Sequence, residues 1–132
     1  MTLRLIVALL LGTCAVACSG APPAPALGLD TSGTVYEEKE LDQPVRPITI
    51  PTPDYPAELQ SRGTEGRVQL EYIVGPEGHV EPSSIKVLSA THPGFGQEAA
   101  KAIHDAFFRA GVKNGLYVRS RVKQLISFHV GS

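Results

Sequence analysis

The chain has 132 residues, a formal net charge of −1 at pH 7, an aromatic content of 6% and no tryptophan. This length accommodates one domain and an additional segment. With neither a basic balance nor a basic patch interleaved with aromatic residues, a nucleic-acid partner is not expected. Residues 19–54 carry six acidic and two basic side chains, whereas residues 55–132 carry seven acidic and nine basic ones. So mild an asymmetry is typical of a solvated surface.

The N-terminus has the pattern of an export signal. Arg4 precedes an apolar run that passes into small residues and reaches Cys18. The apolar part is shorter than the roughly 20 residues that span a bilayer, so we interpret residues 1–17 as a signal peptide. Ala15-Val16-Ala17-Cys18 resembles a bacterial lipobox, which predicts a lipid on Cys18. Plain secretion, or retention of the leader as an uncleaved anchor, are the alternatives.

Cysteine and proline divide the remaining chain. Both cysteines, Cys14 and Cys18, lie in the leader, so the rest has no disulfide, cysteine metal site or thiol nucleophile. Prolines recur through residues 18–52 among glycines, polar residues and acids, a composition that predicts a flexible linker. A short strand over residues 45–50 is a minor alternative. Residues 53–132 are the expected folded domain.

The first half of that domain predicts a helix followed by two strands. Pro56 suits the first turn of a helix that Gly63 ends. Apolar residues then alternate from Val68 to Val74, which indicates a half-buried strand. Residues 75–78 read Gly-Pro-Glu-Gly, a turn. The second strand, over residues 80–87, changes parity and predicts a bend at residues 82–84.

The second half predicts one helix and one long strand. Phe95, Ala99, Ala102, Ile103, Ala106 and Phe107 fall on one face of a helix that begins near Gly94 and ends before Gly111. After a turn at residues 113–115, alternation over residues 118–130 predicts a strand with a basic outer face. The order α-β-β-α-β predicts an α+β fold, with two helices packed on one face of a three-stranded antiparallel sheet.

Residues 53–130 resemble the TonB C-terminal domain. The resemblance is carried by Tyr55-Pro56, Gly63-x-x-Gly66-x-Val68, Glu77-Gly78-x-Val80, Phe107-Phe108 at the helix end, and Asn114-Gly115 before a strand that ends in Phe128. The family usually has Phe-x-Pro-Ala where this chain has Phe108-Arg109-Ala110-Gly111. Energy-transducing members also carry an N-terminal membrane helix that engages a proton-driven motor complex, which the short run before Cys18 does not match.

The resemblance implies a binding module of the bacterial envelope, without enzymatic activity or cofactor. Members capture an extended segment of an outer-membrane transporter by adding it as a strand beside the last strand. Carried over, this implies a partner-binding surface at Val118, Arg119, Ser120, Arg121, Val122 and Lys123, with a further contact at Pro53, Asp54 and Tyr55. Because Ser19 rather than aspartate follows Cys18, we expect a lipid anchor in the outer membrane, with the domain facing the periplasm.

Several alternatives stay open at this stage. The basic side chains of the last strand could instead protect a free sheet edge from aggregation, and Tyr55 could be a core residue. At the level of function, the rivals are an envelope scaffold that binds peptidoglycan or forms a homodimer, and an energy transducer with an uncleaved leader.

The residues do not favour catalysis. His79, His92, His104 and His129 lack metal-ligand spacing. His104 and Asp105 are neighbours in the predicted helix and are not expected to face each other. We therefore predict neither catalytic residues nor a metal.

Overall fold

The computed structural model describes residues 28–131, so the predictions for the leader and for Cys18 lie outside the described residues. The elements, in chain order, are β1 (Gly28–Leu29), β2 (Val35–Glu37), the 3-10 helix η1 (Glu38–Glu40), β3 (Arg46–Thr49), α1 (Ala57–Ser61), β4 (Gly66–Val74), the 3-10 helix η2 (Pro82–Ser84), β5 (Lys86–Ala90), α2 (Pro93–His104), β6 (Phe107–Arg109), β7 (Gly111–Lys113) and β8 (Leu116–Phe128).

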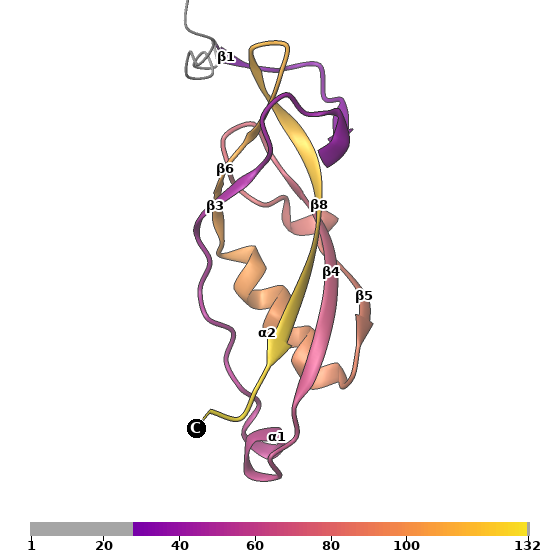
Figure 1. Cartoon of the computed structure of the whole chain (residues 1–132), viewed down its shortest axis with the longest axis vertical. Helices are drawn as coiled ribbons and strands as arrows, with labels where there is room; N and C mark the ends of the chain where they lie inside the picture. Colours follow the sequence, from indigo (N-terminus) through magenta and orange to yellow (C-terminus); the bar gives the residue numbers. More distant parts are fainter. Residues whose placement is uncertain (1–27, 132) are drawn as a thin grey trace, which may run out of the picture.

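A long antiparallel pair, β4 and β8, forms the centre of the main sheet (Figure 1). β5 pairs antiparallel with the other side of β4, and β7 folds back on the start of β8. β1 and β2 run parallel to β8, while β3 and β6 form a separate two-stranded sheet. The predicted three-stranded sheet is thus corrected to a six-stranded and a two-stranded sheet. The additional strands come from segments without an alternating apolar pattern.

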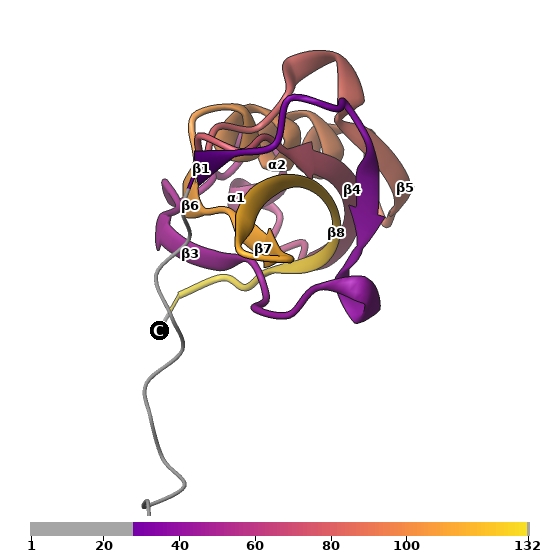
Figure 2. The ribbon, with the colours of Figure 1, turned by 90° about the horizontal axis from the view of Figure 1, so that it is seen from above.

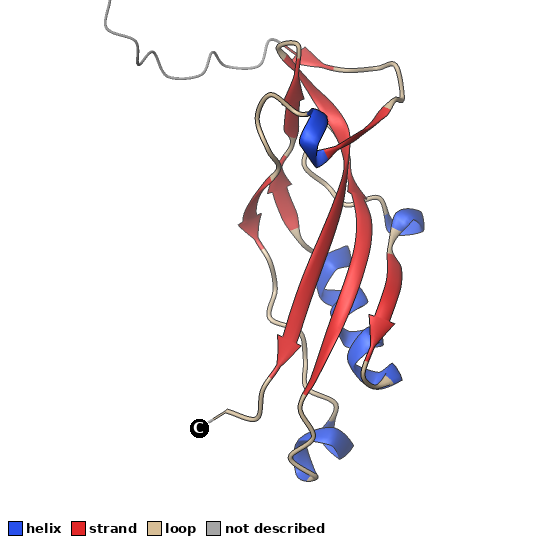
Figure 3. Cartoon of the chain, turned by 45° about the vertical axis from the view of Figure 1, so that its right-hand side comes forward, coloured by secondary structure: helices blue, strands red, loops and turns tan. Residues whose placement is uncertain are grey.

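One face of β4 and β8 carries the core. Val68, Leu70, Tyr72 and Val74 on β4 are all completely buried, as the alternation predicted. α2 packs against β4 and β5 (Figure 3). In contrast, α1 lies beyond the ends of β4 and β8 (Figures 1 and 3), from where Leu59 joins the core. The expected pair of helices on one face is therefore reduced to α2.

The second helix is shorter than its apolar pattern predicted. α2 ends at His104, and Phe107–Arg109 form β6 against β3. Phe108 is buried from this strand, and its amide donates to the Gly78 carbonyl at 2.9 Å. A helical amide at that position would instead bond within the helix. The periodicity of the apolar residues could not reveal this long-range bond.

The turn at residues 75–78 is confirmed, and it requires glycine at its end. The Gly78 amide donates to the Gly75 carbonyl at 3.0 Å, and Gly78 adopts a φ of +93°. A Cβ at Gly78 would lie 2.0 Å from the Phe108 carbonyl oxygen. The glycine thus allows the turn to approach β6 closely enough to bond with it.

The described part of the expected linker, residues 28–52, contains β1, β2, η1 and β3. Seen from above, residues 28–40 wrap around the first half of the curved β8 (Figure 2). No residue between 28 and 58 is fully buried. Backbone pairing and ion pairs order residues 28–40, whereas Val45 and Ile50 add partly buried contacts with the core. Composition underestimates the order of such a segment, because composition reports chiefly on burial.

Candidate partner-binding edge

The direction of the backbone groups on β8 follows from the bonds on the far side of β4. Thr91 and Glu81 donate to the carbonyls of Arg67 and Ile73, at 3.1 Å and 2.9 Å. The odd-numbered residues of β4 therefore face β5. In an antiparallel ladder, opposite residues either both face each other or both face away. The odd-numbered partners on β8, from Arg121 to Ser127, hence point their N–H and C=O groups to the outer edge.

The chain's own β2 covers the first part of this outer edge. Val35, Tyr36 and Glu37 lie opposite Arg119, Ser120 and Arg121 in parallel register. In parallel pairing, Tyr36 takes up the outward groups of Arg119 and Arg121. Before this point, Leu116 and Tyr117 pair with both β1 and β7. The edge predicted to be open is thus occupied up to Arg121.

The second part of the edge has no strand partner within residues 28–131. From Lys123 to Ser127, β8 pairs only with β4. The outward-facing residues here are Lys123, Leu125 and Ser127, all of them exposed, and the Leu125 side chain is 59% exposed. A large aliphatic side chain beside unpaired backbone groups is the usual composition of a strand-addition site.

The even-numbered residues predicted as contacts turn out to face inward. Val118 and Ser120 are buried, at 2% and 0% exposure, and Val122 packs against the core. Their side chains belong to the core face of β8. A strand added at the outer edge would instead lie beside Arg119, Arg121 and Lys123. Leu125 lies within the strand edge that the sequence predicted but not among the predicted contacts, Ser127 lies beyond that edge, and both extend this set. The alternation of the last strand contained the signal for both.

The two arginines of the edge have different partners. Arg119 forms a fork with Glu81, with Nε–Oε1 and Nη2–Oε2 distances of 2.6 Å and 2.7 Å. The hydrogen bond from Arg119 lowers the pKa of the Glu81 carboxyl, and the same bond raises the pKa of Arg119. Arg121 instead donates from Nη1 to Glu37 of β2 at 2.7 Å. Arg119 is therefore held by the domain, and Arg121 chiefly by the covering strand.

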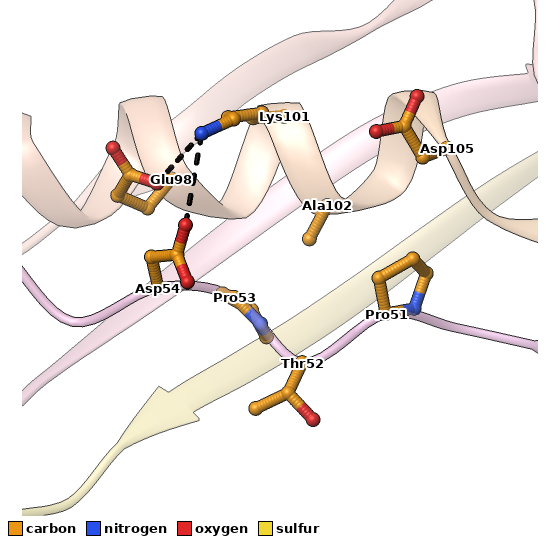
Figure 4. Close-up of a pocket in the computed structure, with 8 residues that line it drawn as sticks. All are labelled: Pro51, Thr52, Pro53, Asp54, Glu98, Lys101, Ala102 and Asp105. Carbon is orange, nitrogen blue, oxygen red and sulfur yellow. Dashed lines mark ion pairs between the residues drawn. The ribbon is translucent and has the colours of Figure 1, made fainter.

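The loop predicted as a second contact lies along α2 and not beside β2. Pro53 and Asp54 line a small pocket of about 120 Å³ against α2, where Lys101 Nζ is 3.6 Å from Asp54 and 3.9 Å from Glu98 (Figure 4). The centroid of the Tyr55 ring lies 5.5 Å from that of Phe95 and 5.9 Å from that of Phe128, and the Tyr55 hydroxyl donates to the Thr64 carbonyl. Tyr55 therefore has the contacts of a core residue.

The histidines and acidic side chains of the described residues are spread over the surface. None of the His, Cys, Asp and Glu residues within 28–131 cluster in threes that could bind a metal. His104 Nδ1 lies 2.8 Å from Asp105 Oδ1, which corrects the prediction that these residues do not face each other. Asp105 is the C-cap of α2, so its side chain is free to turn back. Both side chains are more than half exposed.

Together, the fold and the edge define the class, a small α+β protein-interaction domain. The sequence matches the family described as Gram-negative bacterial TonB protein C-terminal over residues 51–130, and the chain belongs to this family. Domains of this family are interaction domains of the Gram-negative envelope that in general bind outer-membrane transporters. Within residues 28–131, no helix has the length and apolar character needed to cross a membrane.

Solved structures of the family share the fold. The Pseudomonas aeruginosa TonB C-terminal domain is 23% identical, with a TM-score of 0.57, and the match covers 83% of this chain and 98% of that one. The TonB2 protein of Vibrio anguillarum is 22% identical, with a TM-score of 0.51, and covers 86% of this chain and 98% of that one. The comparison with curated proteins gave no match.

Proposed function

We propose that this protein is an exported, lipid-anchored binding module that docks an extended segment of an outer-membrane transporter by strand addition along β8. Two findings support the proposal. The chain belongs to a family whose members bind such transporters. In addition, the outer edge of β8 already accepts a strand at Arg119–Arg121 and has none from Lys123 to Ser127 within the described residues. This second observation carries the proposal.

The length of the free edge sets the strength of the contact. Each outward residue offers one N–H and one C=O, so Lys123, Leu125 and Ser127 offer about six hydrogen bonds to an added strand. Such bonds contribute about 1 kcal/mol net each, and ordering a flexible segment offsets much of this gain. A firm complex therefore needs either a good side-chain contact at Leu125 or the additional edge at Arg119 and Arg121.

Membrane attachment belongs to the proposal as well. If Cys18 carries a lipid, nine residues connect it to Gly28, the first described residue. An extended chain spans at most about 3.6 Å per residue, so the domain stays within roughly 30 Å of the lipid as long as β1 and β2 stay paired with β8. This tether is much shorter than a linker that runs to residue 52 would be. Mass spectrometry of the mature N-terminus tests the anchor, which an intact Met1 would disprove.

In-cell photocross-linking tests the docking edge. A photoreactive residue is placed at Leu125, and a matched one at Leu88, which is also exposed, at 46%, but lies on β5. Position 125 should yield an adduct that peptide mass spectrometry identifies as an outer-membrane transporter, and position 88 should yield none. Adducts from position 125 that contain only peptidoglycan or a second copy of the chain would refute the transporter proposal and favour the scaffold.

A further inference from the structure

We infer that β2 occupies the partner's place on the first part of the docking edge, at Arg119–Arg121. An extended segment of the partner, with an acidic residue at the position of Glu37, displaces β2. This inference rests on the proposed function and names the chemistry of the partner. β2 lies on the same outward groups, Arg119 and Arg121, that strand addition along β8 would use. The occupied and the docked states therefore exclude each other.

The segment is held by contacts that a competing strand can replace. None of residues 28–40 is buried, so their release exposes little apolar surface. β2 contributes three residue pairs and β1 two, and the Asp30 amide donates to the Tyr117 carbonyl at 2.8 Å. The Glu37–Arg121 ion pair joins side chains that are 43% and 39% exposed. Exposed ion pairs contribute little to stability. Local opening of such a segment requires much less free energy than global unfolding.

Residues 42 and 43, directly after this segment, stay attached to the domain through contacts with residues 112–114 when β2 leaves. Asp42 donates from its amide to the Val112 carbonyl at 2.8 Å, and the Val112 amide donates to Gln43 at 3.0 Å. The Asp42 carboxylate accepts from the Asn114 amide at 2.8 Å and lies 3.7 Å from Lys113 Nζ. Residues 28–40 can therefore swing away as a strap while residues 42 and 43 keep the attachment point fixed.

Release of the strap changes the two arginines differently. Arg119 keeps its fork with Glu81 and loses only the bond from Nη1 to the Gly33 carbonyl at 2.5 Å. Arg121 loses Glu37 and retains Glu71 at 3.7 Å, a carboxylate that Lys123 also approaches at 3.8 Å. After release, one carboxylate thus faces two cations. An acidic side chain on the incoming segment replaces the Glu37 carboxylate, so that two carboxylates again face the two cations.

The test uses the full chain and a synthetic peptide of its own residues 33–40 as the probe. Tyr36→Pro removes the N–H that faces β8 and opens the edge. Val35→Pro is the matched control, because the N–H of Val35 points away from β8. We monitor backbone amides of Arg119–Lys123 by NMR during the peptide titration. A tethered strand competes at an effective concentration of about millimolar, so the titration extends to that range.

The expected result is peptide binding to the Tyr36→Pro chain, and at least about tenfold weaker binding to the wild type and the Val35→Pro chain, whose edge is occupied. A peptide with glutamine in place of Glu37 should bind the opened chain more weakly. Equal binding to all three chains, or binding to none, would overturn the inference. The peptide assay contains no transporter, so a failure of the cross-linking experiment leaves this result intact.

Amide exchange of the wild-type chain gives a second test that needs no variant. The Arg121 amide faces the strap, whereas the Gln124 amide faces β4. Exchange at Arg121 should proceed through local opening and be many-fold faster than exchange at Gln124. If both amides exchange at the same slow rate, the strap opens only when the whole domain unfolds, and β2 is a permanent strand of the sheet.

Discussion

Individual residues on β8 and β4 separate into those that hold the core and those that face a partner. Tyr72 belongs to the first kind, because burial raises the pKa of its hydroxyl and that hydroxyl donates to Gln124 at 2.6 Å. Leu125 belongs to the second, with a side chain that is 59% exposed. Along β8, side chains that face the core alternate with side chains that face solvent. Single substitutions can therefore test stability and binding separately.

Truncation of a core residue should destabilise the domain. Leu70→Ala removes a side chain with 0% exposure from the centre of β4, and we expect a loss of about 2–5 kcal/mol in the free energy of unfolding. Chemical denaturation measures this loss. Leu125→Ala is the control and should leave the midpoint nearly unchanged. A Leu70→Ala midpoint within error of the wild type would place Leu70 outside the core.

The turn glycine Gly78 should tolerate no side chain. Gly78→Ala places a Cβ against the Phe108 carbonyl at a φ of +93°. Gly115→Ala is a matched control, because Gly115 has a φ of +76° with no atom within 4 Å of the added Cβ. We expect Gly115→Ala to show only the backbone cost, about 1 kcal/mol, and Gly78→Ala to show a larger one. Equal shifts in melting temperature would argue against the close approach.

The Glu81–Arg119 fork should make stability depend on pH. The hydrogen bond from Arg119 lowers the folded-state pKa of Glu81 below its ordinary value of 4.5. The fork therefore stabilises the fold above that value, and its contribution is lost as pH falls through the folded-state pKa. Glu81→Gln should lower the melting temperature at pH 7, and the difference from wild type should shrink as the pH falls below 4.5. Glu77→Gln, at an exposed position, is the control.

At the scale of elements, proline substitutions at neighbouring positions of β8 should have opposite effects, because successive N–H groups point to opposite sides of the strand. Arg121→Pro removes an N–H that points to the outer edge, whereas Val122→Pro removes one that points to β4. The first should release β2 and weaken partner binding, because the edge from Lys123 to Ser127 remains, with a small change in stability. The second should destabilise the domain by about 3 kcal/mol or more. Arg121→Ala separates the loss of the side chain from the loss of the N–H.

Cross-linking yield and melting temperature together measure this contrast. If Arg121→Pro unfolds the domain as strongly as Val122→Pro, the Arg121 N–H belongs to the interior of the sheet. If Arg121→Pro leaves binding unchanged, the partner does not use the part of the edge at Arg119–Arg121.

Elements that carry their own pattern could be predicted from the sequence, and elements that depend on distant contacts could not. The alternation in residues 68–74 and 118–130 located β4 and β8, although β8 ends at Phe128. Gly63 and Gly78 located the end of α1 and a turn. β6 was hidden in an apparent helical face, because the Gly78 carbonyl is remote in sequence. β2 was hidden because no residue in it is buried. The basic edge was predicted, but its cover was not.

At the scale of the whole molecule, the charge asymmetry of the sequence has a structural counterpart. The acidic N-terminal part contributes Glu37, Asp42 and Asp54, and the basic C-terminal part contributes their partners Arg121, Lys113 and Lys101. The asymmetry is typical of a solvated surface, yet in the structure these ion pairs join the two parts of the chain. These pairs are exposed or half-exposed, so salt should weaken them.

High salt should therefore loosen the strap before it affects the domain. At about 1 M salt the screening length is about 3 Å, and we expect faster amide exchange at Arg121 with little change at Gln124. Exchange measured in low and high salt checks this expectation. An equal acceleration at both residues would mean that salt acts on the whole fold and not on the Glu37–Arg121 pair.

The proposed role as a whole requires that the outer edge of β8 is where the partner binds. The direct measurement is amide exchange of the chain, alone and in complex with the outer-membrane transporter that cross-linking identifies. Docking by strand addition predicts new protection at Lys123, Leu125 and Ser127, whose amides face outward, and little change at Val122, Gln124 and Ile126, whose amides already bond to β4. Protection confined to β5 or α2, or absent from the odd-numbered residues of β8, would contradict it.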